Sequence, residues 1–461
     1  MSLLVYLPAA FIAFVILRLI PYIWIAYKSR DIPGPPCSFF LGNTPLKNLR
    51  NPAKALAHLH GAAAETLASG ENLLRMRLYA FIITVPLNGE ALKPLLDSSE
   101  EITKGLDYEI MHPWMGDGLL FSTGSKWKSR RRLLTPSFHF SILQGYSSLI
   151  DRHARVLVDI LEEKGGNDLD IYECLRMCAL DIICDTSMSY DLGAQRDPHQ
   201  PYVKALAKYN RFAALYPMNL HMHLKIVWAL FYMRKFNGLV RTLKSFTQEI
   251  IQHKLAEDVD EDKSKRKAFL DTLIEHHRNG ELTLEDIREE VDTFMFAGHD
   301  TTSSGMTWTL WCLATNPEEQ KIAYDEVNSI FGDSDRDCTM DDIKEMHYVE
   351  RCIKESMRVF PPVTLVERRL HKDFKIGPHT VPATTNIYIS PSVVHNNAQD
   401  VRRFDPDRFL PENASKRHPY DYIPFSAGAR NCIGGRRHRS RSHPTAGQEA
   451  AHLVHSTLIA F

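Results

Sequence analysis

The chain has 461 residues, of which 44% are hydrophobic and 24% are charged, which is enough apolar content for a large buried core. A formal net charge of −1 argues against nucleic acid or another polyanion as a partner. The eight cysteines show no repeating spacing, so a disulfide framework is not expected, and the chain is predicted to face the cytosol.

The first predicted element is a membrane anchor at residues 1–27. Apolar and aromatic residues fill positions 3–27, interrupted by Pro8, Arg18 and Pro21. At about 1.5 Å per residue, a helix of this length can cross a bilayer. A cleaved signal peptide is the alternative, but the apolar stretch is long for one and no small-residue cleavage site follows it.

A basic and proline-rich hinge is predicted at residues 28–36. Lys28 and Arg30 directly follow the apolar stretch, and positive charge on this flank predicts that everything downstream stays in the cytoplasm. The following sequence Pro-Gly-Pro-Pro at 33–36 predicts a stiff, non-helical spacer.

Beyond the hinge, helical patterns alternate with short strand-like runs such as residues 81–85, and we find no internal repeat. In the sequence Trp-Lys-Ser-Arg-Arg, Trp127 and Arg131 stand four residues apart, so they share one face of a helix. An indole and a guanidinium on one face suit the binding of a carboxylate, although this short pattern alone is weak.

A long helix is predicted from Thr283 to Thr315. The sequence Thr-Leu-Glu-Asp gives it a capping-box start, Asn-Pro at 316–317 stops it, and its length would be roughly 48 Å. Within it, Ala-Gly-His-Asp-Thr-Thr at 297–302 is a poor helical composition. The acid Asp300 beside the hydroxyl of Thr301 suits a proton path, and an ordinary polar kink is the alternative.

Two further patterns follow. Glu355 and Arg358 stand three residues apart and can pair on a helix, although such pairs are usually solvated and worth well under ~1 kcal/mol. About fifty residues later comes Phe-Asp-Pro-Asp-Arg-Phe at 404–409, which includes Arg408.

The most specific pattern is Phe-Ser-Ala-Gly-Ala-Arg-Asn-Cys-Ile-Gly at 425–434. Gly428 and Gly434 permit a tight turn and the close approach of a flat ligand, and the turn presents Cys432. A thiolate beside backbone N–H groups and the cation Arg430 would have a lowered pKa and could bind a metal.

Spelled as F-x-x-G-x-R-x-C-x-G, this turn resembles the heme-binding loop of the cytochromes P-450. The sequences at 297–302, 355–358 and 404–409 resemble the A-G-x-D-T-T, E-x-x-R and P-E-R-F motifs of the same family, the last with aspartate in place of glutamate. Four further segments resemble family four, which ω-hydroxylates fatty acids: GLLFSTGSKW at 118–127, LLTPSFHF at 133–140, EVDTFMF at 290–296 and HPYDYIPF at 418–425.

The resemblance implies a mainly helical α+β fold with small sheets around a buried heme, preceded by the N-terminal membrane helix. It implies a monooxygenase that inserts one oxygen atom of O2 into a C–H bond. Cys432 would be the axial ligand of the heme iron, and Asp300 and Thr301 would deliver protons. The other cofactor-binding residues would be Phe425 and Gly434 in the loop, and Trp127, Arg131, Arg368 and Arg430 near the propionates. Glu355, Arg358 and Arg408 would form a structural triad.

The resemblance also implies partners and location. Electrons would come from NADPH through a cytochrome P-450 reductase, with cytochrome b5 as a further donor, at the endoplasmic reticulum membrane. The substrate would be a small lipophilic molecule. Candidate walls of its pocket are Phe294, Phe296, Val363 and residues 226–233, although ordinary core packing is the alternative for each of them. Many family-four members carry a glutamate where this chain has Ala297, which cannot form an ester, so noncovalent heme b is expected.

The resemblance stops after Gly434. The catalytic domain would therefore be 37–434, incomplete at its C-terminus, and 435–461 would be an atypical basic tail without the helix that follows the cysteine in the family. The alternative function is a catalytically inactive, truncated or mispredicted heme-binding remnant. Two weaker interpretations are a nucleic-acid patch at 436–441 and a zinc site formed by Cys432, His438 and His443.

Overall fold

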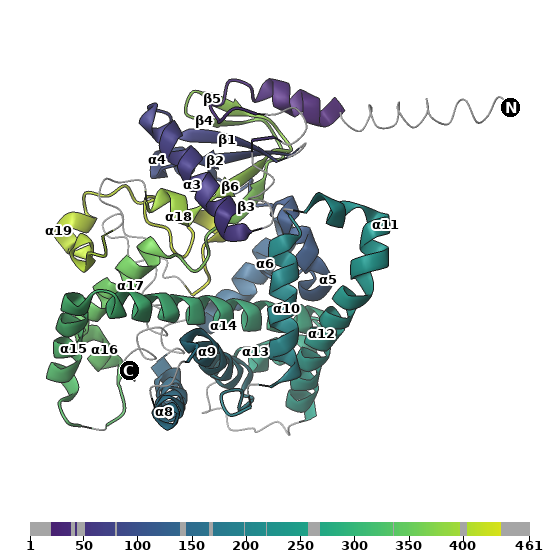
Figure 1. Ribbon diagram of the computed structural model, residues 1–461. Coiled ribbons are helices and arrows are strands. Elements are labelled where there is room, and N and C mark those ends of the chain that lie inside the picture. The colour runs from purple at the N-terminus through teal and green to yellow at the C-terminus, as the bar shows by residue number, and fades with distance from the viewer. Residues whose placement is uncertain are drawn as a thin grey trace.

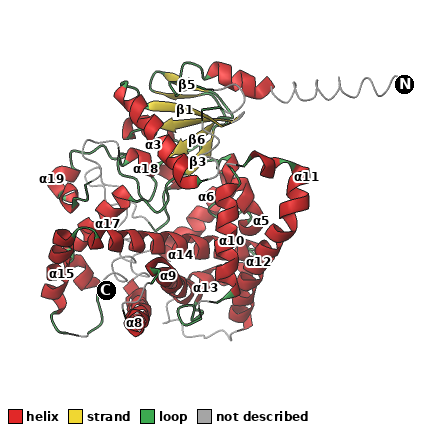
Figure 2. Ribbon diagram, in the orientation of Figure 1, coloured by secondary structure: helices red, strands yellow, loops and turns green. Residues whose placement is uncertain are grey.

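A computed structural model describes residues 20–37, 42–43, 51–78, 81–138, 144–165, 169–197, 199–217, 219–256, 268–334, 336–396 and 403–434. Helices dominate this part of the chain, and the strands gather at one end of the molecule (Figure 2). The predicted mainly helical α+β fold is confirmed. The anchor residues 1–19 and the tail 435–461 lie outside the described residues.

The helices before the long central helix are α3 (Pro52–Ala68), α4 (Gly89–Leu96), η1 (Leu106–Met111), α5 (His112–Met115), α6 (Gly124–Leu134), η2 (Thr135–Phe138), η3 (Gln144–Tyr146), α8 (Ser147–Lys164), α9 (Ile171–Met188), α10 (Pro201–Leu215), η4 (Leu220–His223), α11 (Lys225–Val227), the π-helical turn η5 (Trp228–Tyr232), α12 (Met233–Ala256) and α13 (Phe269–Arg278). From the central helix onward they are α14 (Leu284–Ala314), α15 (Pro317–Phe331), α16 (Met340–Glu345), α17 (His347–Val359), α18 (Pro391–Val394), η6 (Pro406–Phe409), α19 (Pro411–Ala414) and η7 (Gly428–Arg430).

Two small sheets lie beside α3 and α4 (Figure 1). The larger has the order β1-β2-β6-β3, formed by β1 (Leu73–Leu78), β2 (Phe81–Pro86), β6 (Asn386–Ile389) and β3 (Val366–Arg369). β2 pairs in parallel with β6, and the other two pairings are antiparallel. β4 (Phe374–Ile376) and β5 (His379–Val381) form the second sheet. The predicted strand at 81–85 is therefore confirmed.

The helix α14 crosses the molecule between the sheet end and the lower helices, where it packs against α9, α12, α13 and α17 (Figure 1). Its predicted capping box is present: the Asp286 backbone N–H donates to Thr283 Oγ1 (3.1 Å), and the Thr283 N–H donates to Asp286 Oδ2 (3.0 Å). With 31 residues it is about 47 Å long, close to the predicted length.

The loop that carries Cys432 lies between two parts of the hydrophobic core. Ala429 and Ile433 pack against the cluster that contains Trp114 and Met115, whereas Phe425 packs against the cluster that contains Met306 and Met357. The apolar side chains around the cysteine thus hold the loop on both sides.

The start of the described chain is a helix at residues 20–28. It is tied to the sheet end by the contact of Tyr22 with Phe81, whose ring centroids lie 5.7 Å apart, and by the ion pair of Lys28 with Asp373 (3.1 Å). Among the helices of the described residues, none combines the length and the hydropathy needed to cross a bilayer. Most of the predicted anchor is outside this part of the chain.

Candidate active site

The turn around Cys432 has the tight backbone that the sequence predicts at one of its two glycines. Gly428 has φ +70°, and a Cβ there would lie 1.8 Å from the carbonyl oxygen of Leu96. Gly434 is less constrained, because a Cβ there would meet only Cys432 Sγ, at 4.0 Å. The Cys432 N–H donates to the Phe425 carbonyl (2.9 Å), which closes the loop and leaves the cysteine exposed.

Arg430 fastens this loop to the segment that precedes α6. Its guanidinium donates to three backbone carbonyls: Nε to Ile102 (3.0 Å), one terminal nitrogen to Leu119 (3.2 Å) and the other to Ser122. The guanidinium carbon also lies 4.7 Å from the ring centroid of Trp127. The structure thus brings two of the predicted propionate-binding residues together.

Arg131 contacts the loop from α6. Its terminal nitrogens donate to the carbonyl oxygen of Asn431 (2.8 Å), to Asn431 Oδ1 (3.0 Å) and to the carbonyl oxygen of Cys432 (3.4 Å). Trp127 and Arg131 therefore both face the loop, as their spacing on one helical face indicates, but the hydrogen bonds of Arg131 hold the backbone around the cysteine.

Several cations crowd together beside the loop. Arg368 on β3 is 3% exposed, and burial lowers its pKa. Burial and repulsion by Arg368 lower the pKa of Arg430 to about 9. The pKa of Lys104 falls well below its usual value because of burial and of both arginines. A crowded group of like charges gains stability from an anion, so these residues would suit the two propionates of a heme, and the Cys432 thiolate would hold its iron.

Asp300 and Thr301 lie on α14. Burial raises the pKa of Asp300 although Arg176 opposes this, and Asn210 Nδ2 of α10 donates to Asp300 Oδ1 (3.4 Å). The Thr301 hydroxyl donates to the Ala297 carbonyl one turn earlier (2.7 Å). Neither side chain has a hydrogen bond to the Cys432 loop within the described residues, so the acid and the hydroxyl are carried by an element separate from the thiol.

The predicted structural triad is assembled at the junction of α17 and η6. Glu355, which is fully buried, accepts from Arg358 Nε (2.7 Å) and terminal nitrogen (2.8 Å) and from Arg408 Nε (3.2 Å). Its Oε1 also accepts from the Asp405 N–H (3.0 Å). The pair at 355–358 is therefore not a solvated surface pair, which its spacing alone would favour.

Of the candidate pocket walls, Phe294 shows the core packing that was its alternative, and the run at 226–233 lies at the surface. Phe294 is 7% exposed and packs against Phe138 and Phe269, at centroid distances of 4.9 and 4.4 Å, as core residues do. The run at 226–233 is largely exposed: Ile226 is 75% and Phe231 71% exposed. An apolar run in the sequence does not distinguish a pocket wall from an apolar surface, because both need the same residue types.

Sequence reasoning did not find Lys104, Asn431, Asn210 or Arg176. Each of these residues interacts with a segment that is distant in the sequence. Only Asn431 stands inside a recognised motif, and its position next to Cys432 could have marked it as a site residue.

Comparisons with known proteins agree with this geometry. A family profile described as Cytochrome P450 matches residues 33–436. Cytochrome P450 4V2 of Mus musculus is 39% identical over 371 residues, which are 75% of this chain and 69% of that protein. Cytochrome P450 4c21 of Blattella germanica is 41% identical over 75% of this chain and 73% of its own length. Cytochrome P450 4c3 of Drosophila melanogaster is 37% identical over 90% of this chain and 81% of its own.

The fold has a solved counterpart in the crystal structure of the cytochrome P450DA heme domain, with a TM-score of 0.77 at 22% identity, over 93% of this chain and 89% of that one. The helical fold, the cysteine loop and its cations define a heme-thiolate monooxygenase, which uses heme, O2 and electrons derived from NADPH through a redox partner. The chain belongs to the cytochrome P450 family and, within it, to family four.

Proposed function

We propose that this chain hydroxylates a fatty acid or a related lipid at the endoplasmic reticulum membrane, with electrons passed from NADPH by a cytochrome P450 reductase. A surface that we term the apolar ridge carries the proposal. It comprises Leu224, Ile226, Leu230, Phe231 and Met233, which are 55%, 75%, 73%, 71% and 43% exposed. Adjacent exposed apolar side chains mark contact with a membrane or with another protein, and the N-terminal anchor expected from the sequence favours the membrane. Access to a lipid phase suits a lipophilic substrate.

The residues of the loop have distinct proposed roles. A bound heme supplies the redox chemistry that activates dioxygen. Cys432 would hold its iron, Phe425 and Gly434 would border it, and Trp127, Arg368 and Arg430 would face its propionates. Arg131 is a positioning residue, since it holds the backbone at Asn431 and Cys432. Glu355, Arg358 and Arg408 keep α17 and η6 together.

Asp300 and Thr301 would move protons. Because burial raises the pKa of Asp300, this carboxyl holds its proton more readily than an exposed aspartate and is suited to pass it on. Thr301→Ala should lower the amount of product formed for each NADPH consumed, and Thr302→Ala is the neighbouring control. Equal coupling in wild type and Thr301→Ala would remove Thr301 from this role.

Heme should be held without a covalent bond, because Ala297 on α14 has no carboxyl to form an ester. Extraction with acidified organic solvent should therefore release all heme from the wild type. Ala297→Glu tests the position itself, since a retained heme fraction in this variant would place residue 297 within reach of the macrocycle.

A basic surface on α6 is available to the redox partners. Lys128 and Arg132 are exposed there, whereas Arg130 is buried and pairs with Asp286. We propose that the reductase, and cytochrome b5 as a second donor, approach this face, which opposite charge on a partner would favour. The anchor at 1–27, the hinge at 28–36 and the catalytic domain at 37–434 complete the proposed organisation.

The deciding experiment uses the full 461-residue chain, expressed in membranes with a heme precursor. The reduced, carbon-monoxide-bound difference spectrum should show the Soret band of thiolate-ligated heme, and Cys432→Ser should lose it. Reconstitution with reductase, NADPH and dodecanoic acid should then give hydroxylated product. A thiolate band without oxidation of any fatty acid would reject the substrate class, and a chain that takes up no heme would be the inactive remnant.

A further inference from the structure

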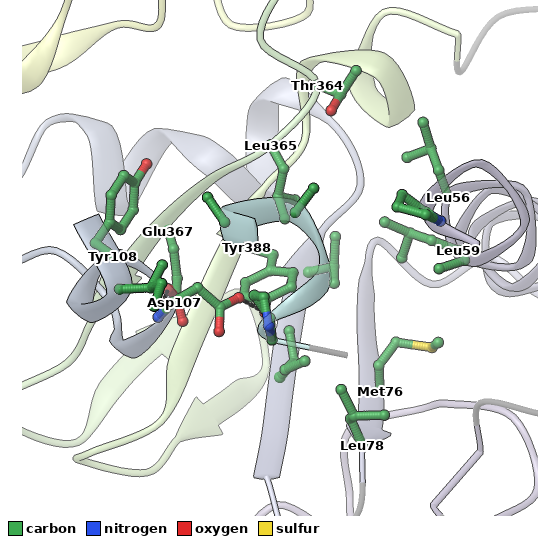
Figure 3. A pocket seen from close by; sticks show the side chains of 18 of the residues that line it. Leu56, Leu59, Met76, Leu78, Asp107, Tyr108, Thr364, Leu365, Glu367 and Tyr388 are labelled. Atoms are coloured by element: carbon green, nitrogen blue, oxygen red, sulfur yellow. Dashed lines mark hydrogen bonds between the residues drawn. The ribbon is translucent and has the colours of Figure 1, made fainter. Parts of the chain in front are cut away.

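A cavity of about 490 Å³ lies between α3, the larger sheet and η1, which is within the size range of small-molecule sites. Most of its wall is aliphatic: Leu56 and Leu59 come from α3, Met76 and Leu78 from β1, and Ile83 and Val85 from β2. Figure 3 shows Leu56, Leu59, Met76 and Leu78 on one side and the polar side chains of Asp107 and Glu367 on the other. The cavity therefore has an apolar body and one acidic end.

The acidic end is built from three segments that are distant in sequence. The Tyr388 hydroxyl donates to Asp107 Oδ2, and the Asp107 backbone N–H donates to Glu367 Oε2 (3.1 Å). Glu367 is 2% exposed and presses against Gly105, where a Cβ would lie 1.8 Å from Glu367 Cδ. One carboxylate oxygen of Glu367 thus caps the start of η1.

The second oxygen of Glu367 has no such partner. Glu367 Oε1 is buried without a hydrogen bond. The charges of Arg369 and Lys104 act on Glu367, and that of His223 acts on Asp107. None of these three lines the cavity, and the described residues that do line it include no lysine, arginine or histidine. A buried polar atom without a hydrogen bond is costly, so the Glu367 carboxyl still lacks one partner on the side of the cavity.

We propose that this cavity binds the positively charged head group of an amphiphile, with the cation at Asp107 and Glu367 and the hydrocarbon chain against the aliphatic wall. The inference goes beyond the proposed function and does not rest on it, because the ligand seated here need not be the molecule that is oxidised. Burial and the nearby Asp107 raise the pKa of Glu367 to about 8, and a bound cation would reverse this shift.

A fatty acid suits this cavity less well than a cation does. Its carboxylate would face the carboxyls of Asp107 and Glu367, and the described residues that line the cavity offer it no base, so charge repulsion opposes its binding. A neutral alcohol head would accept or donate a hydrogen bond but would not neutralise either acid. Ligands that share one hydrocarbon chain and differ only in the charge of the head group should therefore bind this cavity with different affinities.

The test compares octyltrimethylammonium, octanol and octanoate, which share one chain. The quaternary nitrogen has no lone pair, so it cannot coordinate a heme iron. Binding to the heme-loaded full chain in phosphatidylcholine nanodiscs is measured by calorimetry without NADPH, against empty nanodiscs. We expect octyltrimethylammonium to bind at least about tenfold more tightly than either competitor.

Two variants each remove one ionisable carboxyl and keep the shape. Glu367→Gln retains a carbonyl oxygen for the Asp107 N–H, and Asp107→Asn retains one for Tyr388, so the local fold is preserved. Each should weaken binding of the cation by about tenfold, whereas Glu318→Gln, at an exposed position on α15, should not. Heme content and the thermal midpoint identify a misfolded variant, and Leu56→Phe then tests the cavity from its apolar side.

Equal affinity for octyltrimethylammonium and octanol would overturn the proposal. So would a preference for octanoate, or wild-type affinity in both neutralised variants. Because the readout is binding, these failures are separate from any failure of fatty-acid hydroxylation.

Discussion

Arg430 shows how one side chain serves a loop that has little regular structure of its own. Its planar fork reaches three carbonyls on the segment 102–122, a geometry that a lysine ammonium does not reproduce. The desolvation that lowers its pKa is offset by these hydrogen bonds and by the Trp127 ring. The arginine thereby connects the cysteine loop to the rest of the molecule.

Replacing Arg430 by lysine tests whether its hydrogen-bonding geometry or only its positive charge is needed. Arg430→Lys keeps the cation but loses most of the three hydrogen bonds, so the free energy of unfolding should fall by about 2 kcal/mol and heme content should fall with it. Denaturant unfolding and the heme-to-protein ratio measure the two effects. Arg132→Lys, at an exposed position on α6, is the control. An unchanged heme ratio in Arg430→Lys would contradict the role of its fork.

His299 should make the protein sensitive to acid. It is 1% exposed, its Nδ1–H donates to the Met295 carbonyl (3.1 Å), and burial lowers its pKa to about 4. Because the unfolded histidine titrates near 6.5, the unfolded state binds the proton first as the pH falls. The contribution of neutral His299 to the free energy of unfolding is therefore complete above pH 6.5. It is lost as the pH falls from about 6.5 to 4, and the total loss is on the order of 3 kcal/mol.

Urea unfolding at a series of pH values checks this prediction. His299→Asn retains a donor for Met295 but has no titrating group, so its stability should decline less than that of the wild type over the same window. His347→Asn, at an exposed position, should follow the wild type. Parallel curves for wild type and His299→Asn would show that His299 does not carry the acid sensitivity.

Among elements, the junction of α17 and η6 depends on a single acid. Glu355 offers its two oxygens to Arg358, Arg408 and the Asp405 N–H, which ties a helix to a turn about fifty residues later. Neutralising Glu355 removes the ion-pair partner that the buried Arg358 and the half-buried Arg408 share, and such a loss is far more costly than that of a surface pair.

Glu355→Gln should lower the free energy of unfolding by about 3–5 kcal/mol. On the same helix, Glu350 forms a partly exposed ion pair with Lys354 (2.8 Å), so Glu350→Gln should cost less than about 1 kcal/mol. Denaturant midpoints of the two variants give the comparison. Similar midpoints would show that α17 is held mainly by its apolar contacts.

On the scale of the whole molecule, the apolar ridge should meet lipid. Trp228 lies within the same segment, in the turn η5, so brominated phosphatidylcholine should quench its fluorescence in reconstituted membranes. Trp228→Phe should therefore lower the quenched fraction. Trp311→Phe removes an indole that is 49% exposed, at the end of α14 that leads into α15, and α15 is distant from α11 in Figure 1; this variant should leave that fraction unchanged or raise it. Equal quenching in wild type and Trp228→Phe would place the ridge away from the bilayer.

The sequence by itself determined the cysteine turn, the long helix and the strand at 81–85. These features depend on local rules: Gly428 is needed for its positive φ, Thr283 and Asp286 cap a helix reciprocally, and β-branched residues favour strands. Each rule acts within a few residues, so it can be read without knowledge of the fold.

Only the tertiary structure decided which charges are buried together and which apolar segments are exposed. Arg430 bonds to carbonyls some three hundred residues earlier, Glu367 meets Asp107, and the apolar run at 226–233 lies on the surface. The physical reason is that burial depends on what the rest of the chain places beside a residue, and desolvation and charge pairing then set its energy. The composition of the chain and the spacing of its residues do not reveal which neighbours the fold brings together.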